Sequence, residues 1–188
     1  MIPAQPLQDE LIQVSPELAL HAADERFVSA QHQLVLKNRH WLQHSLNWPQ
    51  FVGREDDTRQ NMLSNRMLHQ RGYAKMFLIV LRDELVGVLS FSSIEPLNKA
   101  GYIGYWLDEE HQGQGIITHC LRAFMRYYAQ QGEVRRFVIK CRVDNARSNQ
   151  VAQRNGFALE GCLKQAEFLN GHYHDQNIYA RIIDEELE

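Results

Sequence analysis

Cysteine is scarce in this chain and follows no pattern. The cysteines are odd in number, far apart in the sequence and without the spacing of a zinc site; they are Cys120, Cys141 and Cys162. This usage argues against a secreted domain held by disulfides and against a structural zinc centre. It predicts reduced thiols in a cytoplasmic protein.

Long apolar runs and an excess of charge of one sign are also missing. No apolar stretch approaches the roughly 20 residues that a helix needs to span a bilayer. The first residues, Met-Ile-Pro-Ala-Gln-Pro, lack the basic and then apolar pattern of a secretory signal. The formal net charge of −3 provides no bulk attraction to nucleic acid or to an anionic membrane. We therefore expect neither a membrane nor a nucleic acid as a partner.

The chain does contain enough apolar material for one domain with a sizeable core. Of its 188 residues 44% are hydrophobic and 23% charged, which is ordinary for a globular protein. It has no internal repeat, low-complexity tract or linker. Residues 1–14 are polar and hold two prolines, so we expect a flexible leader there and a single domain over residues 15–184.

Hydrophobic periodicity predicts an alternation of strands and helices. Strands are predicted at 18–22, 74–81, 85–93, 102–107 and 136–143, with two more on either side of Asn170-Gly171. Helices are predicted from Asp24 to about Asn38, from Asp56 or Asp57 to near Gly72, from Gly115 to about Gln131, and from Ser148 to Asn155. This order, with about seven strands and about four helices, predicts an α/β domain with a mixed sheet.

The most informative segment is residues 104–117, Gly-Tyr-Trp-Leu-Asp-Glu-Glu-His-Gln-Gly-Gln-Gly-Ile-Ile. An apolar strand runs into a turn with two glycines, and a helical pattern begins directly after it. Such a turn leaves backbone N–H groups free at a helix N-terminus, where they can hold a pyrophosphate. Tight packing is the alternative explanation. The segment lacks both the Gly-Lys-Ser/Thr of a P-loop and the Gly-x-Gly-x-x-Gly pattern, so it favours a nucleotide-containing carrier such as coenzyme A.

A second motif follows the strand at 136–143. Residues 145–157 contain Asn145, Ser148 and Asn155-Gly156-Phe157, in which Asn and Ser can simply cap a helix. Together the two motifs resemble the GNAT superfamily of N-acetyltransferases, in which Gln/Arg-x-x-Gly-x-Gly/Ala holds the pyrophosphate of acetyl-CoA. That motif falls here on Gln112, Gly115 and Ile117. Ile117 departs from the usual small last residue, so the local packing must differ.

Further segments are similar to the bacterial ribosomal-protein N-terminal acetyltransferases. They lie at 38–49, 94–98, 104–108, 141–145 and 160–166, and the likeness covers almost all of residues 15–184. The resemblance implies a mixed, mostly antiparallel central sheet flanked by helices. It also implies transfer of the acetyl group of acetyl-CoA to the N-terminal amine of a ribosomal protein, such as the serine of the large-subunit stalk protein. Some members of the family are dimers, which leaves a homodimer open.

The resemblance also implies which residues hold the donor. The residues expected to contact acetyl-CoA are Trp106, Leu107, Gln112, Gly113, Gln114, Gly115, Ile116, Ile117, Asn145, Ser148 and Asn149.

The chemistry needs a neutral amine, a base and a proton donor for the leaving thiolate. An N-terminal amine has a pKa of about 7.7–8.0, so only modest help from a base is needed to deprotonate it. Many family members carry a glutamate on the strand before the glycine turn, but this chain has Ala100-Gly101-Tyr102-Ile103-Gly104 there. We predict Glu167 as the base, with a surface carboxylate as the alternative and Glu95 as a second candidate. Ser148 is the predicted general acid, and a helix cap is its alternative role.

Acceptor contacts are predicted less directly. Trp41, Trp48 and Phe51 could form one wall of a peptide groove or belong to the core. Further candidates for the acceptor site are Asn38, Glu95 and Tyr102.

Histidine pairs raise the question of a metal. His40 and His44 have helical i, i+4 spacing, and His172 and His174 alternate on a strand. Neither pair has a third ligand or the His-Glu-x-x-His pattern. We expect no metal.

Two other functions stay open at this point. One is an acetyltransferase for a small amine such as a polyamine or an antibiotic, which would want clustered carboxylates in its acceptor cleft. The other is a non-catalytic module that binds acyl-CoA, which the missing strand glutamate would favour.

Overall fold

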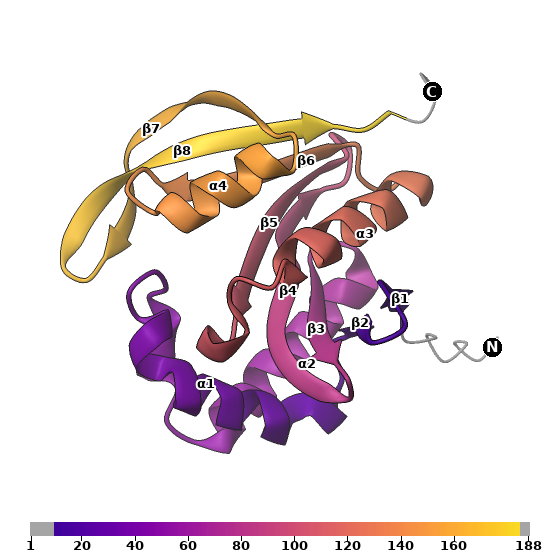
Figure 1. Cartoon of the computed structure of the whole chain (residues 1–188), viewed down its shortest axis with the longest axis vertical. Coiled ribbons are helices and arrows are strands. Elements are labelled where there is room, and N and C mark those ends of the chain that lie inside the picture. The colour runs from indigo at the N-terminus through magenta and orange to yellow at the C-terminus, as the bar shows by residue number, and fades with distance from the viewer. Residues whose placement is uncertain (1–9, 185–188) are drawn as a thin grey trace.

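The structure, a computed structural model, describes residues 10–184 and is drawn in Figure 1. Its strands are β1 (Leu11–Gln13), β2 (Leu18–Ala22), β3 (Lys75–Leu81), β4 (Glu84–Glu95), β5 (Ala100–Leu107), β6 (Arg136–Arg142), β7 (Ala158–Leu169) and β8 (His172–Ile182). Its helices are α1 (Val28–Leu42), α2 (Glu55–Arg71), α3 (Ile116–Gln130) and α4 (Ala146–Arg154), with short 3-10 turns at Glu25–Phe27, Trp48–Phe51 and Glu109–His111. None of these helices is long and apolar enough to cross a membrane.

All strands belong to one sheet in the order β1-β2-β3-β4-β5-β6-β8-β7. Every neighbouring pair is antiparallel except β5 and β6, which are parallel. The parallel pairing covers only three positions and ends where Tyr102 faces Val138. Beyond that point β5 stays on β4 and β6 stays on β8, so the sheet splits between them. In Figure 1, β7 and β8 sweep away from β4 on the far side of this split.

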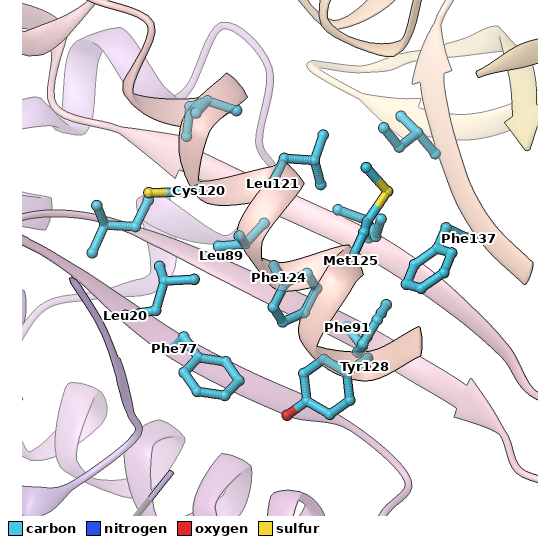
Figure 2. Packing of buried hydrophobic residues seen from close by; sticks show 14 of the residues in the cluster. Leu20, Phe77, Leu89, Phe91, Cys120, Leu121, Phe124, Met125, Tyr128 and Phe137 are labelled. Atoms are coloured by element: carbon cyan, nitrogen blue, oxygen red, sulfur yellow. The ribbon is translucent and has the colours of Figure 1, made fainter. Parts of the chain in front are cut away.

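Two apolar clusters cover the two faces of the sheet. On one face α3 buries its apolar stripe, and Phe124 and Tyr128 pack edge-on or tilted against Phe77 and Phe91 (Figure 2). These rings lie 4.5–6.2 Å apart between centroids, the range in which aromatic pairs attract. On the other face α1 and α2 pack on a second cluster that includes Trp106. Successive residues of β3 and β4 point to opposite faces, and both sets are buried, so apolar side chains cover both faces of the sheet.

The predicted α/β fold with a mixed, mostly antiparallel sheet and four helices is confirmed. The sheet has eight strands where we expect about seven, because β1 adds an edge strand. The second helix is capped differently from the prediction. Arg54 is its N-cap, and Asp57 accepts hydrogen bonds from the backbone N–H groups of Gly53 and Arg54 from within the first turn.

The leader expected over residues 1–14 is not loose at its end. Residues 1–9 lie outside the described part, but Leu11 pairs with His21 in the sheet. The preceding Glu10 accepts a hydrogen bond from His69 (2.7 Å) and one from the Tyr128 hydroxyl (3.2 Å), and it faces the ammonium of Lys75 (3.4 Å). Lys75 is buried, so the carboxylate of Glu10 compensates a charge that would be costly alone. The polar composition of residues 1–14 did not indicate that Glu10 compensates a buried charge.

The contacts of Glu10 predict how stability depends on pH. Burial raises its pKa, but the hydrogen bonds from His69 and Tyr127 and the charge of Lys75 outweigh burial and lower the pKa to about 2. Because the folded pKa lies below the unfolded value of 4.5, the carboxylate stabilises the fold above pH 4.5, and this contribution is lost as the pH falls toward 2. We expect Glu10→Gln to lower the free energy of unfolding by about 1–2 kcal/mol near neutral pH, a value discounted for the solvent that reaches Glu10.

Urea unfolding at a series of pH values measures this effect. The difference between wild type and Glu10→Gln should shrink between pH 4.5 and 2. Glu17→Gln is the control, because it removes only the exposed partner of Arg82. A difference that stays constant with pH would contradict the assignment.

Candidate functional site

The split between β5 and β6 leads into a cavity of about 740 Å³. Its walls come from the end of α1 and the loop after it, the end of β5 with the glycine turn, the first turn of α3, and the connection from β6 into α4. In Figure 1 these segments meet where β5, α3 and α4 approach one another. The cavity thus lies at the ends of β5 and β6, where these two strands no longer pair with each other.

The glycine turn forms one wall of the cavity. Gly113 and Gly115 have φ values of 77° and 75°, a left-handed conformation that glycine adopts without a steric penalty. Gly115 is the N-cap of α3, and the side chain of Gln112 ties the turn back to the carbonyl of Leu107 (3.1 Å). The first N–H groups of a helix have no partner within it and carry its positive dipole end. The turn therefore presents an anion-binding surface to the cavity.

Basic side chains line the opposite wall. Arg142, Arg147 and Arg154 all line the cavity, whereas Asp144 is the one carboxylate among the lining residues and accepts a hydrogen bond from Arg142. Guanidinium groups suit the planar, bidentate recognition of phosphates. Our sequence analysis missed these arginines. The seven-residue spacing of Arg147 and Arg154, which places both on one helix face, was the available signal.

Most residues predicted to hold the donor meet in this cavity. Those that line it are Trp106, Leu107, Gln112, Gly113, Gly115, Ile116, Ile117, Asn145 and Ser148. Gln114 is exposed between the two glycines and is not among the lining residues. Asn149 is also outside the lining, because its amide donates to the carbonyl of Asn145 (2.7 Å) and accepts from the hydroxyl of Tyr179 (2.7 Å). Asn149 thus fastens α4 to the sheet instead of facing the cavity.

Ser148 lies in the cavity with a partner that we did not predict. Its hydroxyl is 3.1 Å from the hydroxyl of Tyr105, which projects from β5. Burial raises the pKa of Tyr105 to about 12, more than the hydrogen bond with Ser148 lowers it, so the phenol stays protonated at neutral pH. The alternative role of Ser148 as the helix cap belongs to Asn145, whose side chain accepts from the backbone N–H of Ser148. The Ser148 hydroxyl is therefore available for proton chemistry.

Glu167, the predicted base, follows an irregular stretch of β7. Leu163 pairs with Gln176 and Glu167 pairs with His174, so β7 carries two additional residues over this stretch. The carboxylate of Glu167 is half-buried and accepts a weak hydrogen bond from Gln176 (3.5 Å), whose strand neighbour Arg142 lines the cavity. Burial, together with the negative charge of Glu167, raises the pKa of Cys141 to about 11. Glu167 itself is not among the lining residues.

The predicted acceptor residues are dispersed. Trp41 lines the cavity, with the guanidinium of Arg147 4.7 Å from the centre of its ring. Trp48 is partly exposed and lies against Trp106 (6.1 Å between rings), and Phe51 is exposed. The structure does not bring the three remaining candidates, Asn38, Glu95 and Tyr102, into the cavity lining.

Glu95, the second candidate for the base, is engaged elsewhere. Its carboxylate accepts hydrogen bonds from Tyr102 and Asn98, both at 2.8 Å, and these bonds lower its pKa. It pairs with Ala100 at the start of β5, whereas the cavity lies at the other end of that strand. Neither Glu95 nor Tyr102 is therefore placed for the transfer.

The predicted hairpin at Asn170-Gly171 contacts the loop after α1, which lines the cavity. Asn170 and Gly171, with φ values of 51° and 81°, form the turn between β7 and β8, as expected from the sequence. The side chain of Asn170 donates to the carbonyl of Gln43 after α1 (3.1 Å), and Arg142 donates to the carbonyl of His44 (3.2 Å). These contacts join the hairpin and β6 to the loop after α1. Among residues 10–184, no three His, Cys, Asp or Glu side chains gather in a way that could hold a metal ion.

Comparison with known proteins agrees with this geometry. The acetyltransferase (GNAT) domain family matches residues 19–158. The ribosomal-protein-serine acetyltransferase of Escherichia coli (strain K12) is 67% identical over 175 residues, which cover 93% of this chain and 98% of that protein.

Solved structures extend the likeness to the backbone. A ribosomal L7/L12 α-N-protein acetyltransferase, RimL, in complex with coenzyme A superposes with a TM-score of 0.91 at 64% identity and covers 93% of this chain and 99% of its own. The microcin C7 self-immunity acetyltransferase MccE, in complex with acetyl-CoA and AMP, has a TM-score of 0.88 at 38% identity, with coverage of 90% and 94%. The chain described here therefore belongs to the GNAT acetyltransferase family.

Proposed function

We propose that this chain transfers the acetyl group of acetyl-CoA to the α-amine of an N-terminal serine on ribosomal protein L7/L12. The observation that carries the proposal is the 67% identity to the Escherichia coli ribosomal-protein-serine acetyltransferase across nearly the full length of both chains. The RimL structure with coenzyme A supports the same donor and the same acceptor. A ribosomal protein as acceptor also fits the cytoplasmic location expected from the sequence.

The residues of the cavity fit the donor. Coenzyme A carries a pyrophosphate, and the left-handed glycines at the N-terminus of α3 leave room and N–H groups for it. Arg147 and Arg154 supply positive charge from α4. Bound acetyl-CoA supplies an activated thioester, and the protein has to hold it, admit an amine and move protons.

Two groups serve the proton transfers in this proposal. Ser148 donates a proton toward the departing thiolate, and the neutral phenol of Tyr105 replenishes that proton through their 3.1 Å contact. Glu167 accepts the proton of the amine, directly or through a water molecule. Glu167 needs to supply only modest basicity, because an N-terminal amine is partly neutral at physiological pH.

The acceptor peptide enters, in this proposal, between Trp41 and the β7–β8 hairpin. Trp41 offers an aromatic wall and the contact of Asn170 with Gln43 closes the rim. A small-amine acetyltransferase is disfavoured because the cavity lining holds one carboxylate, Asp144, which is paired with Arg142. A polyamine would need several.

The function is tested with synthetic peptides. A peptide that begins with the N-terminal sequence of L7/L12 should release thiol from acetyl-CoA and gain the mass of one acetyl group, measured by mass spectrometry. The same peptide with its N-terminus already acetylated is the control. Turnover of spermidine but not of the peptide would favour the small-amine enzyme. Binding of coenzyme A without turnover of any amine would favour a non-catalytic module.

The assigned proton donors and acceptors predict a separation of turnover from donor binding. Ser148→Ala and Glu167→Gln should each lower the single-turnover rate by about 100-fold, the usual effect of losing a general acid or base. The dissociation constant of acetyl-CoA, measured by calorimetry, should change little.

Glu160→Gln is the matched control, because it removes another carboxylate of β7 that pairs with Arg136 at the surface. Unchanged single-turnover rates in both test variants would refute these assignments.

A further inference from the structure

The carboxylate of Asp108 is buried directly beside the donor-binding turn. Asp108 follows the last residue of β5, and only 1% of its surface is exposed. One oxygen accepts a hydrogen bond from the amide of Asn38 (2.8 Å), and the other accepts from Nδ1 of His111 (2.6 Å). The ammonium of Lys37 lies 3.4 Å away. A buried charge of this kind persists only where hydrogen bonds and charges compensate it.

Asn38 completes a two-way connection between α1 and the turn. Its amide nitrogen donates to Asp108, and its carbonyl oxygen accepts from the backbone N–H of Glu109 (3.0 Å). The side chain is 3% exposed, so an acceptor peptide cannot reach it without opening α1. The role in acceptor binding expected from the sequence is therefore not supported.

The connection ends on the wall of the cavity. His111 is held by Asp108 through its side chain and by a backbone hydrogen bond from its N–H to the Asp108 carbonyl (3.0 Å). Its ring lines the cavity next to Gln112 and Gly113, the residues that begin the phosphate-binding turn. Nδ1 of His111 is hydrogen-bonded to Asp108. The opposite edge of the imidazole ring is therefore left to face the cavity.

We propose that Asn38 and Asp108 are positioning residues that fix the donor-binding turn against α1, with His111 as the wall they hold in place. The inference rests on the proposed function in one respect: it takes coenzyme A as the ligand of the turn. It gives a role to a carboxylate that is only 1% exposed. Asn38 and Asp108 are 70 residues apart, so only the fold brings them together.

A reversal of the pair tests the proposal. Asn38→Asp places two carboxylates against each other, and Asp108→Asn places two amides against each other. The double variant restores one amide and one carboxylate with the polarity exchanged, and its net charge equals that of the wild type. Asn38 also donates to the carbonyl of Leu34 (3.0 Å), a bond that a carboxylate cannot make. We therefore expect each single variant to weaken coenzyme A binding at least tenfold and the double variant to regain only part of that affinity, as measured by calorimetry.

A second acetyl donor distinguishes a positioning role of these residues from a general loss of structure. S-acetylpantetheine lacks the phosphates, so its kcat/KM with the acceptor peptide should stay within about twofold of the wild type in all three variants. The KM of the peptide should also be unchanged. Equal losses with both donors, an increased peptide KM without a loss of coenzyme A affinity, or a double variant as weak as the weaker single variant would each overturn the proposal.

His111 provides a test that does not disturb a buried charge. His111→Ala should weaken coenzyme A binding several-fold, and His111→Gln, which keeps an N–H group for Asp108, should restore most of it. Equal binding by wild type and His111→Ala would overturn the proposal. These affinities are measured without an acceptor, so a wild-type protein that binds coenzyme A but acetylates no amine would refute the proposed function and leave this inference standing.

Discussion

The early end of the pairing between β5 and β6 is the constraint on which the rest of the structure depends. The two strands share three parallel positions and then separate after Tyr102 and Val138. Each strand is still held on its outer side, β5 by β4 as far as Leu107 and β6 by β8 as far as Arg142. The split is therefore a rigid opening in a continuous sheet, and the cavity lies at its mouth. On one face, the cluster under α3 continues from the β3–β5 half of the sheet to Phe137, Ile139 and Tyr179 in the other half.

Different elements around the split contribute different groups to the site. The turn before α3 and the arginines of α4 provide N–H groups and positive charge for a phosphorylated donor, while Tyr105 and Ser148 bring two hydroxyls together from β5 and α4. The loop after α1 and the β7–β8 hairpin meet through Asn170, where we propose that the acceptor enters. In the proposed function, donor and acceptor thus contact different elements. The buried contact between Asn38 and Asp108 joins α1, which lines the cavity through Trp41, to the segment that leads into the glycine turn.

Local patterns in the sequence predicted the parts of the site that are themselves local. The glycine turn, the start of α3 and the Asn170-Gly171 hairpin depend on neighbouring residues, and all are found as predicted. The sequence did not indicate contacts between distant segments. Asn38 is hydrogen-bonded to Asp108, Glu95 to Tyr102, and Glu10 to Lys75. Hydrophobic periodicity gives no information about such pairs. The additional residues in β7 and the hydroxyl pair of Tyr105 and Ser148 were also invisible, because both depend on strand register.

The central claim is that backbone N–H groups at the N-terminus of α3 hold the pyrophosphate of the donor. Amide hydrogen exchange, followed residue by residue with and without coenzyme A, tests it most directly, because it measures those N–H groups. The account predicts that coenzyme A slows exchange at the amides of residues 113–118, while the first amides of α2, which lie outside the cavity lining, exchange at an unchanged rate. Tight binding of coenzyme A that leaves the amides of 113–118 unprotected would contradict the account.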